Sequence, residues 1–223
     1  MDAHAQPLLL LVQANVDPAH EAAFNGWYYH HVPKLLELPG FRWARRYVNV
    51  VGDTKYLALY AIDHVDHLAA LYAADVALRD PKAVAEREKF DSLVGLSDVR
   101  SNVYEQISGS HLLNPFLRAE RPLSAVMMDC VDATREREFN EWYDHSHVPN
   151  LTRINGYVSG ARFRLLDHPL LVGQCPGPKY LAVYELENVE CIPSVADPDH
   201  MSEDARAELA RFQSFGAPLA SHM

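Results

Sequence analysis

An internal duplication limits the fold of this chain more than any other feature of its sequence. Residues 139–149 are FNEWYDHSHVP, and residues 24–33 are FNGWYYHHVP. Residues 55–60 (KYLALY) match residues 179–184 (KYLAVY) in the same order. The offset grows from 116 residues at the histidine to 124 at the lysine, which indicates an insertion of 8 residues between Asp167 and Pro178. Two copies in one chain predict two similar structural units.

Hydrophobic periodicity and turn residues predict the same order of elements in each copy. In the first copy, Asp17 can cap a helix that has Pro18 at its first position. The predicted order is strand, helix, strand, strand, helix, strand, which is the ferredoxin-like unit (βαββαβ). The expected elements are a strand at 8–16, a helix from 19 to 29 or 31 with a turn or kink before Pro33, strands at 41–50 and 56–62, helical segments at 63–77 and 82–93, and a strand at 99–107.

The order begins again after a stretch of mixed charge that contains Gly and Pro. The second copy is expected to have a strand at 123–131, a helix ending at 147, strands at 157–166 and 180–186, and a helix at 203–215. Only residues 216–223 follow, so its last strand is expected to be missing or altered. The predicted division is a first repeat at 1–110, a linker at 111–121 and a second repeat at 122–223.

The composition is that of a globular protein, with 48% hydrophobic and 22% charged residues. A formal net charge of −10 argues against nucleic acid as a partner. No apolar run is long enough to span a membrane, and the run at 8–12 lacks the basic residues of a signal peptide. Three scattered cysteines argue against a disulfide framework and fit a cytoplasmic protein.

A single ferredoxin-like unit leaves one face of its sheet bare, and packing two units sheet to sheet buries both bare faces. The element order, the motif Phe-Asn-x-Trp-Tyr…His-Val-Pro and the later Lys-Tyr-Leu-Ala-x-Tyr resemble the dimeric α+β barrel superfamily and, within it, the EthD-like branch. The resemblance covers roughly residues 8–107 and 122–215. It implies an α+β fold in which two repeats form an intrachain dimeric α+β barrel, with an enclosed cavity in each unit.

The chemistry that the resemblance implies is broad. Related members include cofactor-independent monooxygenases that make quinones, muconolactone-type isomerases, polyketide cyclases and haem proteins. Many of them act on phenolic or aromatic-derived molecules. The resemblance therefore narrows the fold further than it narrows the reaction.

The histidines of the repeated motif are the first candidates for catalysis. Positions i and i+4 share one face of a helix, which pairs Trp27 with His31 and Tyr143 with His147. Histidine titrates near neutral pH and suits proton transfer to or from a phenol or an activated carbon. Asp144 lies three residues before His147 and could orient its ring. The competing interpretation is that each histidine caps its helix end.

Other side chains could contact a substrate. Tyrosine hydroxyls could donate to a substrate oxygen, and one Arg of each strand set could hold a carboxylate or phenolate. The competing interpretation packs the aromatic residues in the core and pairs the arginines in salt bridges. The catalytic candidates are His147, His31, Tyr143, Tyr28 and Asp144. The substrate-binding candidates are Trp27, Trp142, Arg45, Arg46, Arg162, Arg164, Tyr60 and Tyr184.

The sequence predicts no metal site and no cofactor. His30 next to His31, and His145 two residues before His147, lack the i,i+3 or i,i+4 spacing of a chelate on a helix. A Gly-rich phosphate loop and a Gly-x-Ser-x-Gly motif are both missing from the sequence, which argues against nucleotide cofactors and acyl-enzyme chemistry. Haem would need one well-placed His and a large apolar pocket, and a Soret band would reveal it.

The leading interpretation is a cofactor-free acid–base enzyme of aromatic or phenolic catabolism, either a lyase such as a decarboxylase or an isomerase. One alternative is a cofactor-independent monooxygenase that oxidises a phenol to a quinone. A second is a non-catalytic ligand-binding or stress-associated barrel. The expected partner is a small aromatic or phenolic substrate. Pairing of the two repeats within the chain removes the need for a homodimer without forbidding one.

Overall fold

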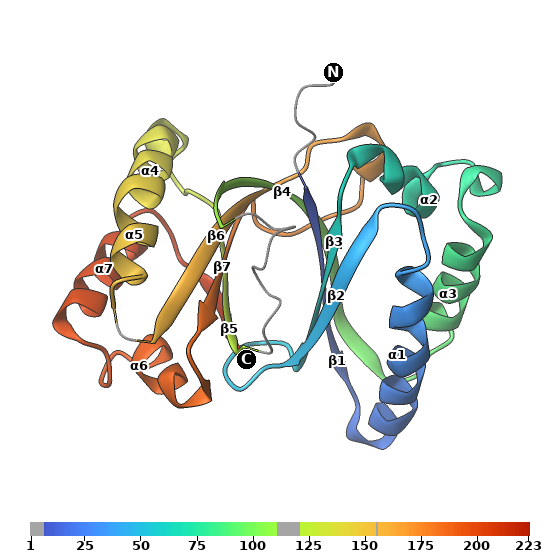
Figure 1. Cartoon of the computed structure of the whole chain (residues 1–223), viewed down its shortest axis with the longest axis horizontal. Helices are drawn as coiled ribbons and strands as arrows, with labels where there is room; N and C mark the ends of the chain where they lie inside the picture. The colour runs from blue at the N-terminus through green and yellow to red at the C-terminus, as the bar shows by residue number, and fades with distance from the viewer. Residues whose placement is uncertain (1–6, 111–120, 155) are drawn as a thin grey trace. The chain divides into compact units, whose positions relative to one another are not determined.

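The computed structural model describes residues 7–110, 121–154 and 156–223, and these residues form two compact units. The first unit contains residues 7–48, 54–105 and 166–177, and the second contains the other described residues. Most of the predicted linker, residues 111–120, lies outside the described residues. Figure 1 shows the helices and strands of both units.

The first unit has the predicted ferredoxin-like order. Its antiparallel strands pair in the order β2-β3-β1-β4, and α1 and α3 lie along one face of this sheet (Figure 1). Its elements are β1 (Leu8–Val16), α1 (Glu21–Leu35), β2 (Phe41–Val48), β3 (Tyr56–Ile62), α2 (Ala69–Tyr72), α3 (Pro81–Asp91) and β4 (Leu96–Gly109), with short 3-10 helices at Pro18–His20, Val65–Leu68 and Val76–Leu78.

Local chemistry explains where α1 begins, and packing explains where it ends. The Asp17 carboxylate accepts a hydrogen bond from the Ala19 backbone N–H at 2.9 Å, and Pro18 follows the cap as predicted. The helix then continues through Pro33 to Leu35, beyond the predicted end at residue 29 or 31. Leu35 is only 7% exposed and packs in the core, so burial of the last turn outweighs the backbone hydrogen bond that Pro33 cannot donate.

The second unit repeats this order with shorter pieces. Its strands pair antiparallel in the order β6-β7-β5-β8. Its elements are β5 (Leu123–Met128), α4 (Glu136–Trp142), a π-helix (Tyr143–His147), α5 (Val148–Leu151), β6 (Tyr157–Leu165), β7 (Tyr180–Leu186), α6 (Ile192–Ala196), α7 (Glu203–Gln213) and β8 (Leu219–His222), with 3-10 helices at Ala133–Arg135 and Val189–Cys191.

The last strand of the second unit is present in an altered form. β8 has 4 residues, whereas β4 has 14. It pairs with β5 from Met127–Leu219 to Ser124–His222. Of the two expected outcomes, a missing or an altered last strand, the structure therefore has the altered one. The segment lacks the β-branched residues that mark a strand in sequence, and the free edge of β5 supplies its pairing instead.

The insertion of the second copy lies in residues 166–177, which belong to the first unit. Leu171, in a 3-10 helix at Pro169–Leu171, is 5% exposed and packs in the core of the first unit. The Leu166 N–H donates to the Val103 carbonyl at 2.9 Å, and the Gly177 N–H donates to Asn102 Oδ1 at 2.7 Å. This segment therefore completes the first unit's core and adds Gln174 to the lining of its cavity.

The two cores lie between each sheet and its helices. Alternate residues of β3, among them Tyr56 and Tyr60, pack with Phe24 and Tyr28 of α1. In the second unit Tyr180 and Tyr184 pack with Phe139 and Tyr143 in the same way. Each core is thus rich in aromatic rings, which favours planar aromatic ligands in any cavity that it encloses.

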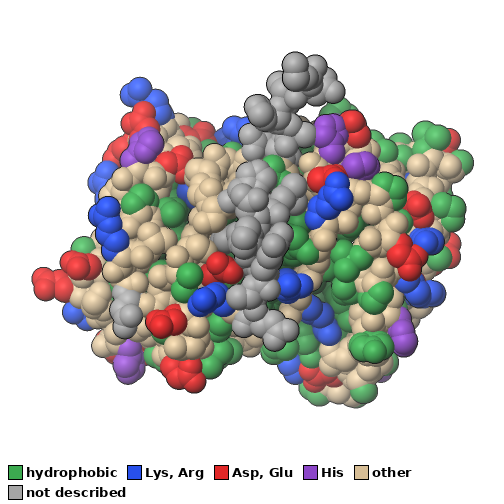
Figure 2. Space-filling view, viewed as in Figure 1, with side chains coloured by type: hydrophobic (Ala, Val, Ile, Leu, Met, Phe, Trp, Pro, Cys, Tyr) green, Lys and Arg blue, Asp and Glu red, His purple; other side chains and the backbone are tan. Residues whose placement is uncertain are grey.

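Figure 2 shows acidic and basic side chains interspersed over the visible face. No helix in the described ranges has the length and apolarity needed to cross a membrane.

Candidate active site

His31 and His147 occupy equivalent positions although their helices differ by one residue. His31 follows Trp27 by four residues, whereas His147 follows Trp142 by five. The π-helical turn at Tyr143–His147 takes up the extra residue. As a result, both imidazoles pack on the tryptophan, with ring centroids 4.1 Å apart in the first unit and 4.5 Å apart in the second.

Each histidine contacts a glutamate from the second long helix of its unit. His31 Nδ1 lies 3.0 Å from Oε2 of Glu86 on α3, and His147 Nδ1 lies 2.6 Å from Oε2 of Glu208 on α7. Sequence reasoning missed both glutamates. A signal was present, because residues 83–90 (AVAEREKF) and 205–212 (ARAELARF) are a further repeat with the glutamate in register.

In the first dyad, Glu86 is held as a carboxylate. Burial alone would raise the pKa of Glu86, but hydrogen bonds from Lys34, Lys89 and His31 outweigh it and lower the pKa to about 2. Lys34 Nζ lies 2.7 Å and Lys89 Nζ 2.9 Å from Oε1. Burial lowers the pKa of His31, and Glu86 offsets part of that shift. At neutral pH the imidazole is therefore neutral, and a carboxylate at Nδ1 directs its lone pair to Nε2.

The second dyad has a different set of neighbours. Asn150 stands where the first unit has Lys34, and its Nδ2 donates to Glu208 Oε1 at 2.7 Å. Burial alone would raise the pKa of Glu208, but hydrogen bonds from His147 and Asn150 lower it. Burial lowers the pKa of His147, with a partly opposing contribution from Glu208. The two dyads thus share their geometry, while only the first has lysines at its carboxylate within the described residues.

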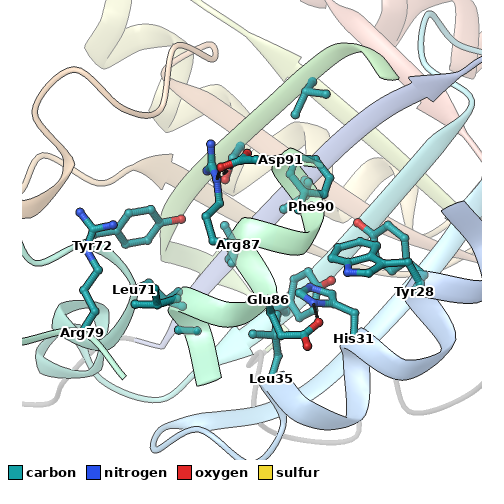
Figure 3. A pocket seen from close by; sticks show the side chains of 18 of the residues that line it. Tyr28, His31, Leu35, Leu71, Tyr72, Arg79, Glu86, Arg87, Phe90 and Asp91 are labelled. Atoms are coloured by element: carbon teal, nitrogen blue, oxygen red, sulfur yellow. Dashed lines mark hydrogen bonds and ion pairs between the residues drawn. The ribbon is translucent and has the colours of Figure 1, made fainter. Parts of the chain in front are cut away.

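Each dyad lies on the wall of a cavity within its own unit. The first cavity, in the first unit, has a volume of about 450 Å³ and is lined by His31, Glu86, Trp27, Tyr28 and Tyr60 among others (Figure 3). The second cavity, in the second unit, measures about 260 Å³ and is lined by residues that include His147, Glu208, Tyr143, Tyr184 and His222. Another cavity of about 760 Å³ in the second unit shares only Glu208 with that dyad.

The tyrosine pairs beside the dyads differ in their hydrogen bonds. Tyr184 Oη donates to Tyr143 Oη at 3.2 Å. The Trp27 indole N–H is buried without a hydrogen bond among the described residues, whereas the equivalent Tyr60 hydroxyl is buried beside the Tyr28 hydroxyl and interacts with it. Burial raises the pKa of Tyr60 well above its usual value, so this hydroxyl stays protonated. The first cavity therefore offers the unused Trp27 N–H donor to a ligand.

The arginines that the sequence nominates take other positions. The Arg46 and Arg162 guanidinium groups each lie 4.1 Å from the ring centroid of the tyrosine that precedes the histidine in its unit. Arg45 donates to the Ala44 carbonyl, and Arg164 is exposed on β6. None of these four arginines lines any of the three cavities described above.

The prediction that Asp144 orients His147 is corrected by the structure. Arg162 Nη1 donates to Asp144 Oδ1 at 2.7 Å, and the Ser108 hydroxyl donates to the same oxygen. The partner of His147 is therefore a residue 61 positions later in the chain.

Comparison with known proteins reveals relatives by structure only. No family model matches the chain, and no curated protein matches it. An anthrone oxidase-like protein superposes with a TM-score of 0.65 at 12% identity, covering 97% of this chain and 90% of its own. A candidate monooxygenase from Fusobacterium nucleatum gives a TM-score of 0.64 at 8% identity, covering 99% and 92%. Another from Lactobacillus acidophilus gives 0.57 at 7%, covering 97% and 92%.

Sequence identities this low establish a shared fold but not a shared activity. The matches span nearly the whole of each chain, so the likeness includes both repeats. The fold consists of two ferredoxin-like repeats in one chain. This confirms the fold that the repeated motifs predict.

Proposed function

We propose that this protein is a cofactor-independent oxygenase that acts on a phenolic or enolisable aromatic compound in the first cavity. The observation that carries the proposal is the His31–Glu86 dyad, which lies on the wall of an aromatic cavity of about 450 Å³. Similar folds carry the names anthrone oxidase-like and candidate monooxygenase, which supports an oxygenase over the lyase or isomerase of the leading sequence interpretation.

The dyad supplies a base for the first chemical step. Glu86 accepts the Nδ1 proton of His31, so Nε2 can take a proton from a phenol or from a ring carbon next to a carbonyl. No protein hydrogen bond to Nε2 is recorded in the described part of the chain. The Trp27 N–H can donate to the oxygen that gains negative charge, which stabilises the resulting anion.

The electron-rich anion then reacts with molecular oxygen, which is the second substrate. For a ring methylene, a carbon–oxygen bond forms at the deprotonated carbon, and the second hydrogen leaves with cleavage of the oxygen–oxygen bond. One oxygen atom becomes the new carbonyl, and the other leaves as water with the two hydrogens. The carbon is oxidised by four electrons and dioxygen is reduced by four, so the reaction consumes one dioxygen for each quinone formed.

The first unit is the better candidate for this reaction. Cavities that hold small molecules usually measure about 300–1,000 Å³, which includes the first cavity and excludes the second, at about 260 Å³. We therefore assign the chemistry to His31 and treat His147 as the matched control.

Oxygen consumption tests the proposal. The purified protein, after an absorbance scan for a Soret band, is mixed with anthrone in an oxygen electrode while quinone absorbance is followed. We expect one dioxygen consumed per quinone, a loss of about 10²–10⁴-fold in kcat/KM for His31→Gln, and little change for His147→Gln. Turnover without oxygen uptake would instead identify a lyase or isomerase, and binding without turnover a ligand-binding barrel.

A further inference from the structure

The first cavity has a cationic side chain, Arg79, at the end opposite its histidine. Arg79 and Arg87 are the Lys or Arg residues that line it in the described chain. Figure 3 shows Arg79 and Tyr72 on one side of the cavity and His31 with Tyr28 on the other. A ligand that fills the cavity therefore meets a base at one end and a guanidinium at the other.

The two arginines differ in whether they already have a partner. Arg87 Nε lies 2.9 Å from both carboxylate oxygens of Asp91. Arg79 Nε donates to the Ala73 backbone carbonyl at 2.7 Å, and no described carboxylate forms an ion pair with Arg79 within 4.0 Å. The terminal nitrogens of the Arg79 guanidinium are thus left to bind an anion.

The rest of the lining points to the same kind of ligand. Tyr72 belongs to this end, and burial raises its pKa to about 12, so it remains a protonated phenol. At the other end, the buried Trp27 N–H lacks a partner among the described residues. An unpaired donor at one end and an unpaired cation at the other fit a ligand with oxygen acceptors at both ends.

The equivalent cavity of the second unit has apolar side chains where the first cavity has Arg79 and Arg87. At the offset that aligns the two glutamates, Arg79 corresponds to Met201 and Arg87 to Leu209. Met201 and Leu209 both line the second cavity, whose recorded lining has no Lys or Arg. Duplication has therefore produced one cavity with a cationic end and one without.

We propose that Arg79 binds a carboxylate of the substrate, so the compound that enters the first cavity is an aromatic acid with its phenolic or enolisable position turned toward His31. Paired N–H groups of a guanidinium match the two oxygens of a carboxylate. A half-buried arginine without a protein anion gains more from such a ligand than an exposed one does. This inference rests on the proposed function only in taking the first cavity as the substrate site.

Calorimetric titration with two matched probes tests whether Arg79 binds the carboxylate. The probes are 1-hydroxy-2-naphthoate and 1-naphthol, which share a ring system and differ in the carboxylate. We expect the wild-type protein to bind the acid at least about 10-fold more tightly than the phenol. Arg79→Met, which copies the second unit, should weaken acid binding by about 10–100-fold and change 1-naphthol binding less than about 2-fold.

Arg87→Leu is the matched control, because Asp91 already occupies that guanidinium, and it should leave the preference for the acid intact. Arg79→Gln is a second variant that removes the cation. Melting curves for all variants separate loss of carboxylate binding from loss of the fold. Equal binding of both probes by the wild type would overturn the proposal, as would a loss of preference in Arg87→Leu. Binding can be measured without turnover. A preference for the acid without oxygen uptake would therefore refute the proposed oxygenase function and support carboxylate binding by Arg79.

Discussion

His31 Nδ1 lies 3.0 Å from a carboxylate oxygen of Glu86, a residue 55 positions later in the chain and on a different helix. The contact joins α1 to α3 and fixes which nitrogen of the imidazole faces the cavity. The second unit repeats it between His147 and Glu208. Four predictions follow from this pairing and from the residues around it.

Glu86→Gln should make His31 a weaker base and lower its pKa. Burial lowers the pKa of His31 and Glu86 raises it, so removing the carboxylate should lower that pKa further. The unprotonated imidazole is the active form, hence the acid limb of kcat/KM should lie below pH 6.5 in the wild type and lower still in the variant. We expect the plateau to fall about 10–100-fold, since a base with a lower pKa accepts protons less readily.

The pH profile of Glu208→Gln is the control for this experiment. The substitution makes the same chemical change in the second dyad and should leave the profile of the first cavity as it is. An unchanged acid limb in Glu86→Gln would show that the dyad does not set the basicity of His31.

His222 should make folding stability depend on pH between about 4 and 6.5. Burial lowers its pKa to about 4, so the unfolded chain takes up the proton first as the pH falls. The free energy of unfolding should therefore decrease from pH 6.5 to pH 4, by on the order of 3 kcal/mol from this residue. Urea denaturation of the wild type and His222→Asn across this range measures the difference, in which other titrating groups cancel. Parallel curves would mean that His222 is solvated in the folded protein.

Deleting His145 should preserve the second unit. This exposed residue lies in the π-helical turn, and its removal gives Trp142 and His147 the spacing found in the first unit. The turn can then become α-helical with His147 still facing Glu208, so we expect the free energy of unfolding to change by less than about 1 kcal/mol.

Deleting Tyr29 from α1 should, in contrast, destabilise the first unit. Tyr29 is 77% exposed but lies in a continuous α-helix, so its loss should rotate His31 by about 100° away from Glu86. We expect a loss of more than about 3 kcal/mol or failure to fold. Equal costs in urea denaturation for the two deletions would refute the role given to the π-helical turn.

Arg162→Met should cost more stability than Arg46→Met. Arg162 is 1% exposed and pairs with Asp144, so the substitution leaves a partly buried carboxylate without its cation, at about 2–4 kcal/mol. Arg46 donates to the neutral Asn25 side chain, so its loss should cost about 1 kcal/mol. Asp144→Asn in the Arg162→Met background should recover part of the loss. Similar unfolding free energies for the two single variants would contradict this account.

The sequence determined the architecture because its signals are local. Repeated motifs and alternating apolar residues predict two ferredoxin-like units, and both appear. The sequence left open whether the last strand of the second copy is missing or altered, because four residues with weak strand propensity form β8 only where β5 offers its edge. Likewise, the π-helical turn could not be foreseen from a one-residue difference between Trp142 and His147, although that difference was visible.

Only the tertiary structure decided which charged groups meet. Glu86 and Glu208 reach their histidines from helices 55 and 61 residues away, whereas Asp144, the nearer carboxylate in sequence, pairs with Arg162. Arg79 lines the first cavity from a loop that carries no periodic signal. Periodicity shows which side of an element is buried. The partner, burial and protonation of a charged side chain depend on the packing of distant elements, which periodicity does not record.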